Sequence, residues 1–262
     1  MISPLPPARA QDVLPPGAAD PRAWSEYASS YDLPPYDGTT HTYLVATTQR
    51  TGSHYLAHLL ARVGTVGVPF EYLNHYRSLL ELDERGWSRS VDSHLQLFTE
   101  MRRRRTGSAG WFGVKAHWHT WQSVTANAQV RDVVRPDRFV YLSRVDVVAQ
   151  AVSLAIAEQT WVWVDVGQER HPATYSRRSI EGALQRIDTE RAAWESYFAH
   201  QSIDVLRLTY EGLIANPDGS VDRVLRHLGM GESKRPFRNM PLPHPRSDGL
   251  VERWSQRYRT GS

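Results

Sequence analysis

The chain has 262 residues, of which 40% are hydrophobic and 23% charged, and its formal net charge is +3. This composition predicts a folded globule with one sizeable α/β domain or two small ones, and the mild positive charge suits an anionic small ligand at least as well as a nucleic acid. Because the sequence contains no cysteine, disulfides, thiol catalysis and cysteine-based zinc sites are excluded.

The first forty residues differ in composition from the rest of the chain. Residues 1–20 are rich in Pro and Ala and predict a flexible tail, whereas several aromatic residues that follow predict an arm packed on the body (Trp24, Tyr27, Tyr31 and Tyr36). We therefore expect a Pro-rich tail and packing arm at residues 1–40 and a single domain at residues 41–262. Neither a secretory signal nor a membrane span is predicted, so a cytoplasmic location is expected.

Strand-like and helix-like segments alternate from position 42 onward. The predicted strands lie at residues 42–46, 110–116, 138–144 and 203–210, and the clearest predicted helices at 53–63, 146–159 and 179–201. Such alternation predicts an α/β fold with a largely parallel central sheet flanked by helices. The run Arg102–Arg105 is interpreted as a solvated turn, with a nucleic-acid patch as the alternative.

A tight loop, "QRTGS" at residues 49–53, joins the first strand to the first helix and has the features of a phosphate site. Gly52 permits a close backbone approach, Arg50 can make charge-assisted hydrogen bonds, and Thr51 and Ser53 add hydroxyl donors. A helix that begins directly after a parallel strand also offers backbone N–H groups and partial positive charge to an anion. The alternative is an ordinary strand–turn–helix connection in which Ser53 is the N-cap.

This loop lacks the parts that ATP-binding loops use. With Gly52 as the last glycine of the pattern G-x-x-x-x-G-K-S/T, the lysine position holds Ser53 and the first glycine position holds Thr47. Phosphoryl transfer from ATP depends on that lysine and on magnesium. The loop therefore suits a phosphate anchor that works without a metal, and a nucleotide-dependent phosphotransferase with a degenerate loop is the less favoured alternative.

Four further stretches accompany the loop in a fixed order. They are "VGVPFEYL" (66–73), "FGVKAHW" (112–118), "FVYLSRVDVVAQAVSLAIAEQTWVW" (139–163) and "WSQRYR" (254–259). Together with "QRTGS" they resemble the PAPS-dependent sulfotransferases, most closely the bacterial trehalose sulfotransferase-like branch. The resemblance implies a P-loop-like sulfotransferase fold.

The same resemblance implies the reaction and the donor, whereas the oligomeric state stays open. The sulfuryl group of 3′-phosphoadenosine 5′-phosphosulfate (PAPS) would pass to a hydroxyl of a carbohydrate or other small metabolite, leaving 3′-phosphoadenosine 5′-phosphate (PAP). Members of the branch can form homodimers.

The resemblance also implies which residues bind the donor. The 5′-phosphosulfate would be held by the loop and the position after it (Arg50, Thr51, Gly52, Ser53 and His54). The 3′-phosphate would be held by Arg144 at the end of a strand and Ser153 on the following helix. Val145 replaces the Pro usual in the family and Ala149 a common Ser, so Gln150 is expected to share the contact.

The proton acceptor implied by the resemblance is Glu71. A carboxylate there can accept the hydroxyl proton as the oxygen attacks sulfur, provided that partial burial raises its pKa. A surface or ion-paired Glu is the alternative, and His117 or His119 is the rival base. Their His-x-His spacing also suits a metal, but no third ligand lies nearby, so none is expected. Lys115 is expected to contact donor or acceptor and is counted with Arg50 among the catalytic residues.

Nine tryptophans are many for this length, and several lie beside the proposed site segments. Because aromatic faces suit sugars, Trp118, Trp161 and Trp163 are predicted to contact the acceptor together with Glu71 and His117. Core packing is the alternative for each tryptophan. A non-enzymatic basic nucleic-acid-binding protein is the second alternative function, but only one arginine run supports it, so no nucleic-acid partner is expected.

Overall fold

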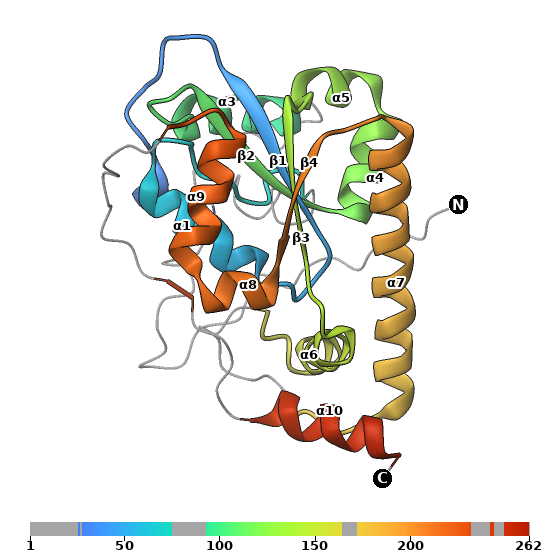
Figure 1. Cartoon of the computed structure of the whole chain (residues 1–262). Coiled ribbons are helices and arrows are strands. Elements are labelled where there is room, and N and C mark those ends of the chain that lie inside the picture. Colours follow the sequence, from blue (N-terminus) through green and yellow to red (C-terminus); the bar gives the residue numbers. More distant parts are fainter. Residues whose placement is uncertain are drawn as a thin grey trace, which may run out of the picture.

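The centre of the molecule is a four-stranded parallel sheet in the order β2-β1-β3-β4 (Figure 1). The structure is a computed structural model that describes residues 26, 28–74, 93–163, 172–231, 242–243 and 249–261. The strands are β1 (His41–Thr47), β2 (Trp111–His117), β3 (Arg138–Ser143) and β4 (Val205–Thr209). Each coincides closely with a predicted strand, which confirms the parallel sheet expected from the sequence.

Helices connect successive strands and cover both faces of the sheet. Those described are α1 (Ser53–Val63), α3 (Ser93–Arg105), α4 (Trp118–Ala126), α5 (Ala128–Val134), α6 (Val147–Thr160), α7 (Arg177–His200), α8 (Tyr210–Ala215), α9 (Pro217–His227) and α10 (Leu250–Thr260), with a short 3-10 helix at Ser29–Tyr31. Asp146 and Ser176 cap α6 and α7 through backbone N–H groups of the first turn. The predicted helices at 53–63, 146–159 and 179–201 are thereby confirmed. None of the described helices is long and apolar enough to cross a bilayer.

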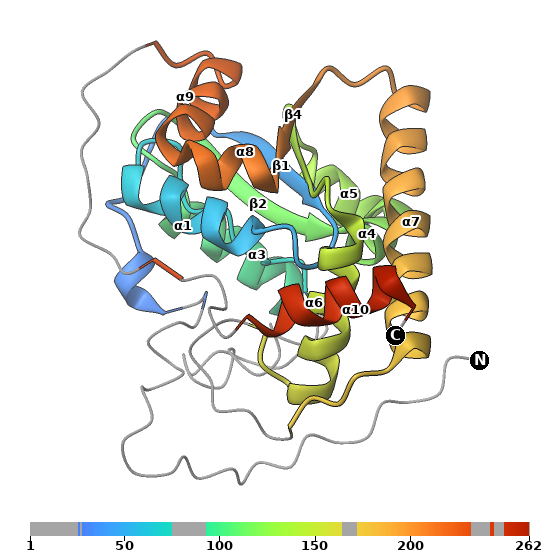
Figure 2. The same ribbon diagram turned by 60° about the horizontal axis from the view of Figure 1, so that its bottom comes forward.

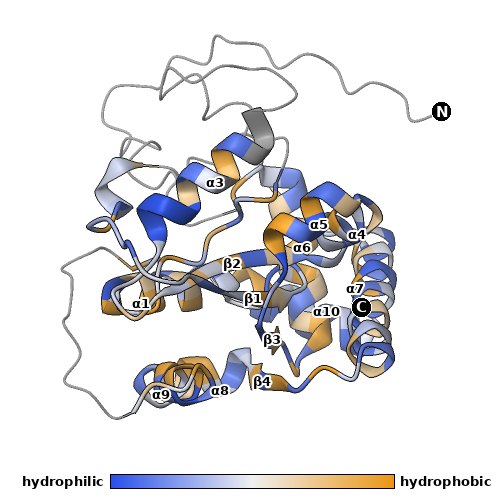
Figure 3. Ribbon diagram, turned by 90° about the horizontal axis from the view of Figure 1, so that it is seen from above, coloured by the Kyte–Doolittle hydropathy of each residue, from blue (hydrophilic) through white to orange (hydrophobic). Residues whose placement is uncertain are grey.

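Alternate residues of the central strands pack into two different cores, as the pleat of a strand requires. Leu44 and Ala46 belong to the core that includes side chains of α3, α4 and α7. Tyr43 and Val45 belong to the core formed with α1, α8 and α9. Seen from above, these two groups of helices lie on opposite sides of the sheet (Figure 3). Strands β1, β2 and β3 are therefore largely buried on both faces, whereas the edge strand β4 carries the exposed Arg207.

The helix α6 lies at the carboxyl ends of the strands, with α10 beside it (Figures 1 and 2). An apolar cluster that includes Ile156, Ile187 and Trp254 joins α6, α7 and α10. Arg259 of α10 also bonds to Asp146, the residue that caps α6, at 2.6 Å. The closing segment "WSQRYR" thus holds in place the helix that follows β3.

The arginines at positions 102–105 lie at the end of α3, so the predicted solvated turn is wrong. Arg102 is half-buried and donates to the end of α5. The side chain of Arg105 is completely buried and donates to the Asp32 carboxylate at 2.9 Å and to the Ala28 carbonyl at 2.8 Å. The run therefore ties the arm, residues 26–38, to the body of the protein and does not form a nucleic-acid patch.

Replacement of Arg105 by Met should lower the free energy of unfolding by about 3 kcal/mol, because losing one partner of a buried ion pair leaves the other polar groups unpaired. Urea unfolding followed by tryptophan fluorescence measures the change. Arg103, which pairs with Glu100 on the exposed side of the same helix, is the matched control, and Arg103→Met should not move the unfolding midpoint. An unchanged midpoint in Arg105→Met would contradict the anchoring role.

Candidate active site

The loop between β1 and α1 has the backbone of an anion site. Gly52 has a φ of 78°, and a Cβ at this position would lie 2.7 Å from the ring of Tyr210, so both conformation and space require glycine. Arg50 has a φ of 65°, a conformation that costs free energy in a residue with a side chain and that often marks functional sites. Since α1 begins at Ser53, its first N–H groups, which have no partner within the helix, lie beside this loop.

Two side chains predicted to bind the donor are instead held within the loop. The hydroxyl of Thr51 is completely buried and bonds to the Thr47 hydroxyl and the Thr48 carbonyl. The Gln150 amide donates to the Thr48 hydroxyl at 2.8 Å and to the Gln49 carbonyl at 2.6 Å. Because buried polar groups are almost always hydrogen-bonded, these four bonds stabilise the conformation of the loop. In this structure the hydroxyl of Thr51 and the side-chain amide of Gln150 are therefore engaged by the protein itself.

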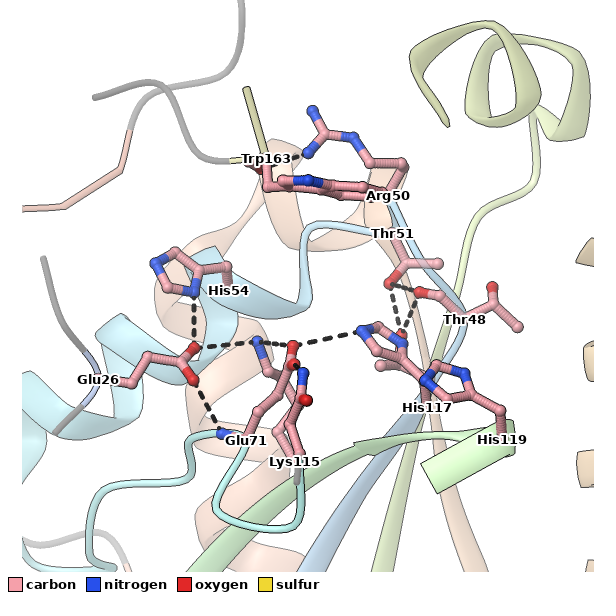
Figure 4. Close-up of polar contacts among 12 residues, drawn as sticks. Glu26, Thr48, Arg50, Thr51, His54, Glu71, Lys115, His117, His119 and Trp163 are labelled. Carbon is pink, nitrogen blue, oxygen red and sulfur yellow. Dashed lines mark hydrogen bonds and ion pairs between the residues drawn. The ribbon is translucent and has the colours of Figure 1, made fainter. Parts of the chain in front are cut away.

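The residues predicted for the two phosphate groups meet in one place. Arg50 Nε donates to Ser153 Oγ at 2.9 Å, and its Nη1 donates to the carbonyl of Trp163 (Figure 4). Arg144 Nη1 donates to the Arg50 carbonyl at 3.4 Å, and its guanidinium lies 4.4 Å from the centre of the Tyr210 ring. Arg144 Nε is buried and has no hydrogen-bond partner within the described residues. Two guanidinium groups therefore lie close together beside the loop, at the carboxyl end of the sheet.

Glu71 lies in a cluster of charged side chains from β2. Its Oε1 is 2.9 Å from Lys115 Nζ and 3.3 Å from His117 Nε2, and Asn74 donates to its other oxygen at 3.2 Å (Figure 4). Lys115 and His117 are two positions apart on one strand, so they point to the same face. The Glu71 side chain is only 14% exposed, but an ammonium at this distance stabilises the charged carboxylate. This interaction opposes the effect of burial that the sequence interpretation assumed.

A second carboxylate, Glu26, completes this cluster and was missed in the sequence. Its side chain is completely buried, with Oε1 at 3.1 Å from His54 Nδ1 and 3.4 Å from Lys115 Nζ. Its Oε2 accepts the backbone N–H of Glu71 at 3.0 Å. Figure 4 shows the Lys115 ammonium between the two carboxylates. No motif reveals Glu26, because it precedes the first strand and lies 45 positions from Glu71.

The two histidines considered as rival bases have different surroundings. His117 contacts Glu71, and its ring stacks on that of His119 with centroids 5.9 Å apart. His119 bonds to Glu190 at 3.4 Å, and this hydrogen bond raises the pKa of His119 although burial opposes it. Of the two, His117 is the one placed to exchange a proton with Glu71. No group of three or more acidic or histidine side chains in the described ranges is arranged to hold a metal ion.

The predicted acceptor tryptophans separate into one core residue and two surface residues. Trp118 packs edge-on against Trp194, with ring centroids 5.1 Å apart, so the geometry favours the core-packing alternative. Trp161 and Trp163, which follow α6, are 62% and 39% exposed. Since the Trp163 carbonyl also binds Arg50, these two rings lie beside the phosphate loop and are the better candidates for contact with an acceptor.

Comparison with known proteins identifies the class. A family model described as Stf0 sulphotransferase matches residues 116–261, more than half of the chain, and the chain therefore belongs to this family and is a sulfotransferase. The match includes Arg144, Ser153 and both exposed tryptophans, whereas Arg50 and Glu71 precede it.

Two curated proteins are similar to this chain along most of its length. Trehalose 2-sulfotransferase of Mycobacterium tuberculosis (strain ATCC 35801 / TMC 107 / Erdman) is 28% identical over 263 residues, which cover 83% of this chain and 94% of that protein. Trehalose 2-sulfotransferase of Mycolicibacterium smegmatis (strain ATCC 700084 / mc(2)155) is 25% identical over 254 residues, with the same two coverages of 83% and 94%.

Solved structures with a likeness to this chain are also sulfotransferases by name. One from Alicyclobacillus acidocaldarius has a TM-score of 0.45 and 12% identity, covering 85% of this chain and 93% of that one. Mouse sulfotransferase SULT7A1 complexed with PAP has a TM-score of 0.43 and 13% identity, covering 92% of this chain and 69% of that one. The family assignment rests on the family model and not on these scores.

The buried His58 makes stability depend on pH. It contacts the Tyr31 hydroxyl at 3.1 Å, and burial, with the neighbouring His54, lowers its pKa from 6.5 to about 3. The unfolded chain therefore binds this proton at a pH where the folded protein does not. The contribution of His58 to the free energy of unfolding is complete above pH 6.5 and is lost as the pH falls toward 3. At about pH 5 the free energy of unfolding is lower by about 2 kcal/mol for this reason.

A His58→Gln variant should lose less stability than the wild type between about pH 7 and about pH 5. Urea unfolding at the two pH values measures both losses. The comparison of losses, rather than of absolute stabilities, removes the cost of the substitution itself. Equal losses in the two proteins would show that His58 is not held neutral.

Proposed function

We propose that this chain transfers the sulfuryl group of PAPS to a hydroxyl of a small carbohydrate, with Glu71 as the proton acceptor. Membership of the Stf0 sulphotransferase family supports sulfuryl transfer. The names of the two curated relatives, both trehalose 2-sulfotransferases, support a sugar acceptor. The assignment of Glu71 rests on the contacts of its carboxylate with Lys115 and His117. Glu26 and His54 connect this cluster to the start of α1, beside the loop.

The residues around the loop fit a donor that carries two phosphate groups. The first N–H groups of α1, Arg50 and Ser53 would hold the 5′-phosphosulfate, since charge-assisted hydrogen bonds and a helix N-terminus both favour an anion. Arg144 would hold the 3′-phosphate, and its buried Nε, without a partner in the ranges described, supports this role. Ser153 Oγ accepts a hydrogen bond from Arg50, which leaves the hydroxyl proton of Ser153 to be donated to the 3′-phosphate.

The reaction requires one bond to form as another breaks. The acceptor hydroxyl oxygen bonds to sulfur while the bond from sulfur to the 5′-phosphate oxygen breaks, and the hydroxyl proton passes to Glu71. Arg50 and the N-terminus of α1 stabilise the negative charge that remains on the phosphate. Lys115 keeps Glu71 ionised and orients it at 2.9 Å. The exposed ring faces of Trp161 and Trp163 would pack against the sugar.

Incubation with PAPS and a panel of hydroxylated acceptors that includes trehalose tests the proposal. We expect release of PAP that depends on a sugar acceptor, measured by chromatography, together with a sulfated product identified by mass spectrometry. Reactions without acceptor and with heat-inactivated protein are the controls. Absence of PAP formation with every acceptor, combined with absence of PAP binding by calorimetry, would refute the proposal.

The Glu71→Gln variant should turn over about 10²- to 10⁴-fold more slowly, because the amide cannot accept the hydroxyl proton. Its affinity for PAP, measured by calorimetry, should stay close to that of the wild type, since Glu71 is not assigned to the donor. Glu195→Gln removes the carboxylate of a surface pair with Arg207 on α7 and β4 and is the control. Wild-type turnover in Glu71→Gln would transfer the role of base to another group, of which His117 is the nearest.

A further inference from the structure

We propose that the N-terminal arm is a structural part of the active site and that Glu26 is a positioning residue for Glu71. The inference rests on the proposed function for the reaction, but the contacts that carry it are those of this structure. Glu26 precedes residues 116–261, which the family model matches, so family membership does not assign it a role.

The side-chain contacts of Glu26 join three segments around the candidate site. Its carboxylate bonds to His54 at the start of α1, to Lys115 on β2 and to the backbone N–H of Glu71 (Figure 4). The side chain is completely buried, and a buried carboxylate is tolerated only when charged or polar partners compensate for its lost hydration. These partners belong to the elements that carry the loop and the proposed base, so the position of Glu26 is coupled to theirs.

The arm that carries Glu26 is anchored to the body by contacts at Glu26 itself and at the residues that follow it. Arg105 donates to the backbone carbonyls of Glu26 and Ala28, at 3.4 Å and 2.8 Å. Tyr31 is buried, and its ring packs edge-on against Phe70 with centroids 4.8 Å apart. Glu26 is therefore brought into the cluster by specific packing and hydrogen bonds of the arm.

Among the described residues, the carboxylates of Glu26 and Glu71 both contact the ammonium of Lys115. Lys115 Nζ is 2.9 Å from Glu71 and 3.4 Å from Glu26. Since part of the ammonium's field is compensated by Glu26, Glu71 remains a stronger base than it would be as the sole partner of Lys115. The bond from the Glu71 N–H to Glu26 also fixes the backbone that carries the base. Within the described residues, the titratable and charged groups that face the two carboxylates come from several elements and the arm. They are Lys115, His117, His119, His54, His58, Tyr31, Tyr72 and Arg105.

The Glu26→Gln variant tests this role because it keeps the shape of the side chain and removes its charge. We expect kcat to fall about tenfold while the KM for PAPS changes by less than about twofold, since Lys115 then acts on Glu71 alone and weakens it as a base. For the same reason, the acidic limb of the pH–rate profile should move to lower pH. Glu26→Asp keeps the charge and should restore the wild-type profile in part.

The matched control is Glu100→Gln, the same chemical change at a carboxylate paired with Arg103 and Arg104 on α3. Its acidic limb and kcat should equal those of the wild type. Circular dichroism verifies that each variant is folded, and Glu26→Asp provides the comparison if Glu26→Gln does not fold. A Glu26→Gln profile that coincides with the wild type, or a Glu26→Asp profile displaced as far as that of Glu26→Gln, would overturn the proposal.

A second measurement needs no turnover and so separates this inference from the proposed function. Histidine NMR follows the titration of His54, whose Nδ1 lies 3.1 Å from Glu26. Loss of the negative charge in Glu26→Gln should move the His54 midpoint to lower pH, because a carboxylate favours the protonated ring. An unchanged midpoint overturns the place of the arm in the site. If the wild type transfers no sulfuryl group, the proposed function fails while the His54 titration still decides where Glu26 lies.

Discussion

The buried ammonium of Lys115 is the charge on which the arrangement of this site depends. A charge that leaves water is costly unless opposite charges and hydrogen bonds surround it, so β2 can deliver Lys115 to the strand ends only if other segments bring carboxylates there. Glu71 belongs to the segment after α1, and Glu26 belongs to the arm before β1; both carboxylates contact Lys115. Compensation of one charge therefore fixes the relative positions of three segments that are distant in sequence. The donor loop shares in this constraint, because His54, one residue into α1, bonds to Glu26.

The parts of the fold that follow from local pattern could be predicted from the sequence. Strand β1 contains the apolar run 43–46 and is followed by a glycine-containing loop. The two helices between β3 and β4, α6 and α7, begin at clear N-caps. The run at positions 102–105 misled because consecutive arginines normally face solvent. The burial of Arg105 depends on Asp32, which is 73 positions away, and no local pattern records so distant a partner. Glu26 was missed for the same physical reason.

The motifs predict the shape of the loop better than they predict the partner of each side chain in it. "QRTGS" marks a loop whose Gly52 and Arg50 adopt positive φ, and that backbone shape is what the short pattern encodes. Whether a hydroxyl or an amide then faces a ligand depends on the neighbours that the fold supplies. The Thr51 hydroxyl is hydrogen-bonded to the Thr47 hydroxyl at the end of β1, and the Gln150 amide donates to the Gln49 carbonyl in the loop. Arg144, with its buried Nε and its ring contact, has no comparable partner in the part of the chain described, so its expected role is the better supported.

The anchoring of the arm has a consequence for the order in which the chain can fold. Glu26 and Lys115 are 89 positions apart, and Arg105 is 77 positions from Ala28. During synthesis the arm leaves the ribosome before its polar partners on α3 and β2 have been made. Contacts of such sequence separation form slowly, because the intervening chain must lose its conformational freedom before they stabilise anything. The cluster around Lys115 is therefore completed late in folding, although the arm that completes it is synthesised before α3 and β2.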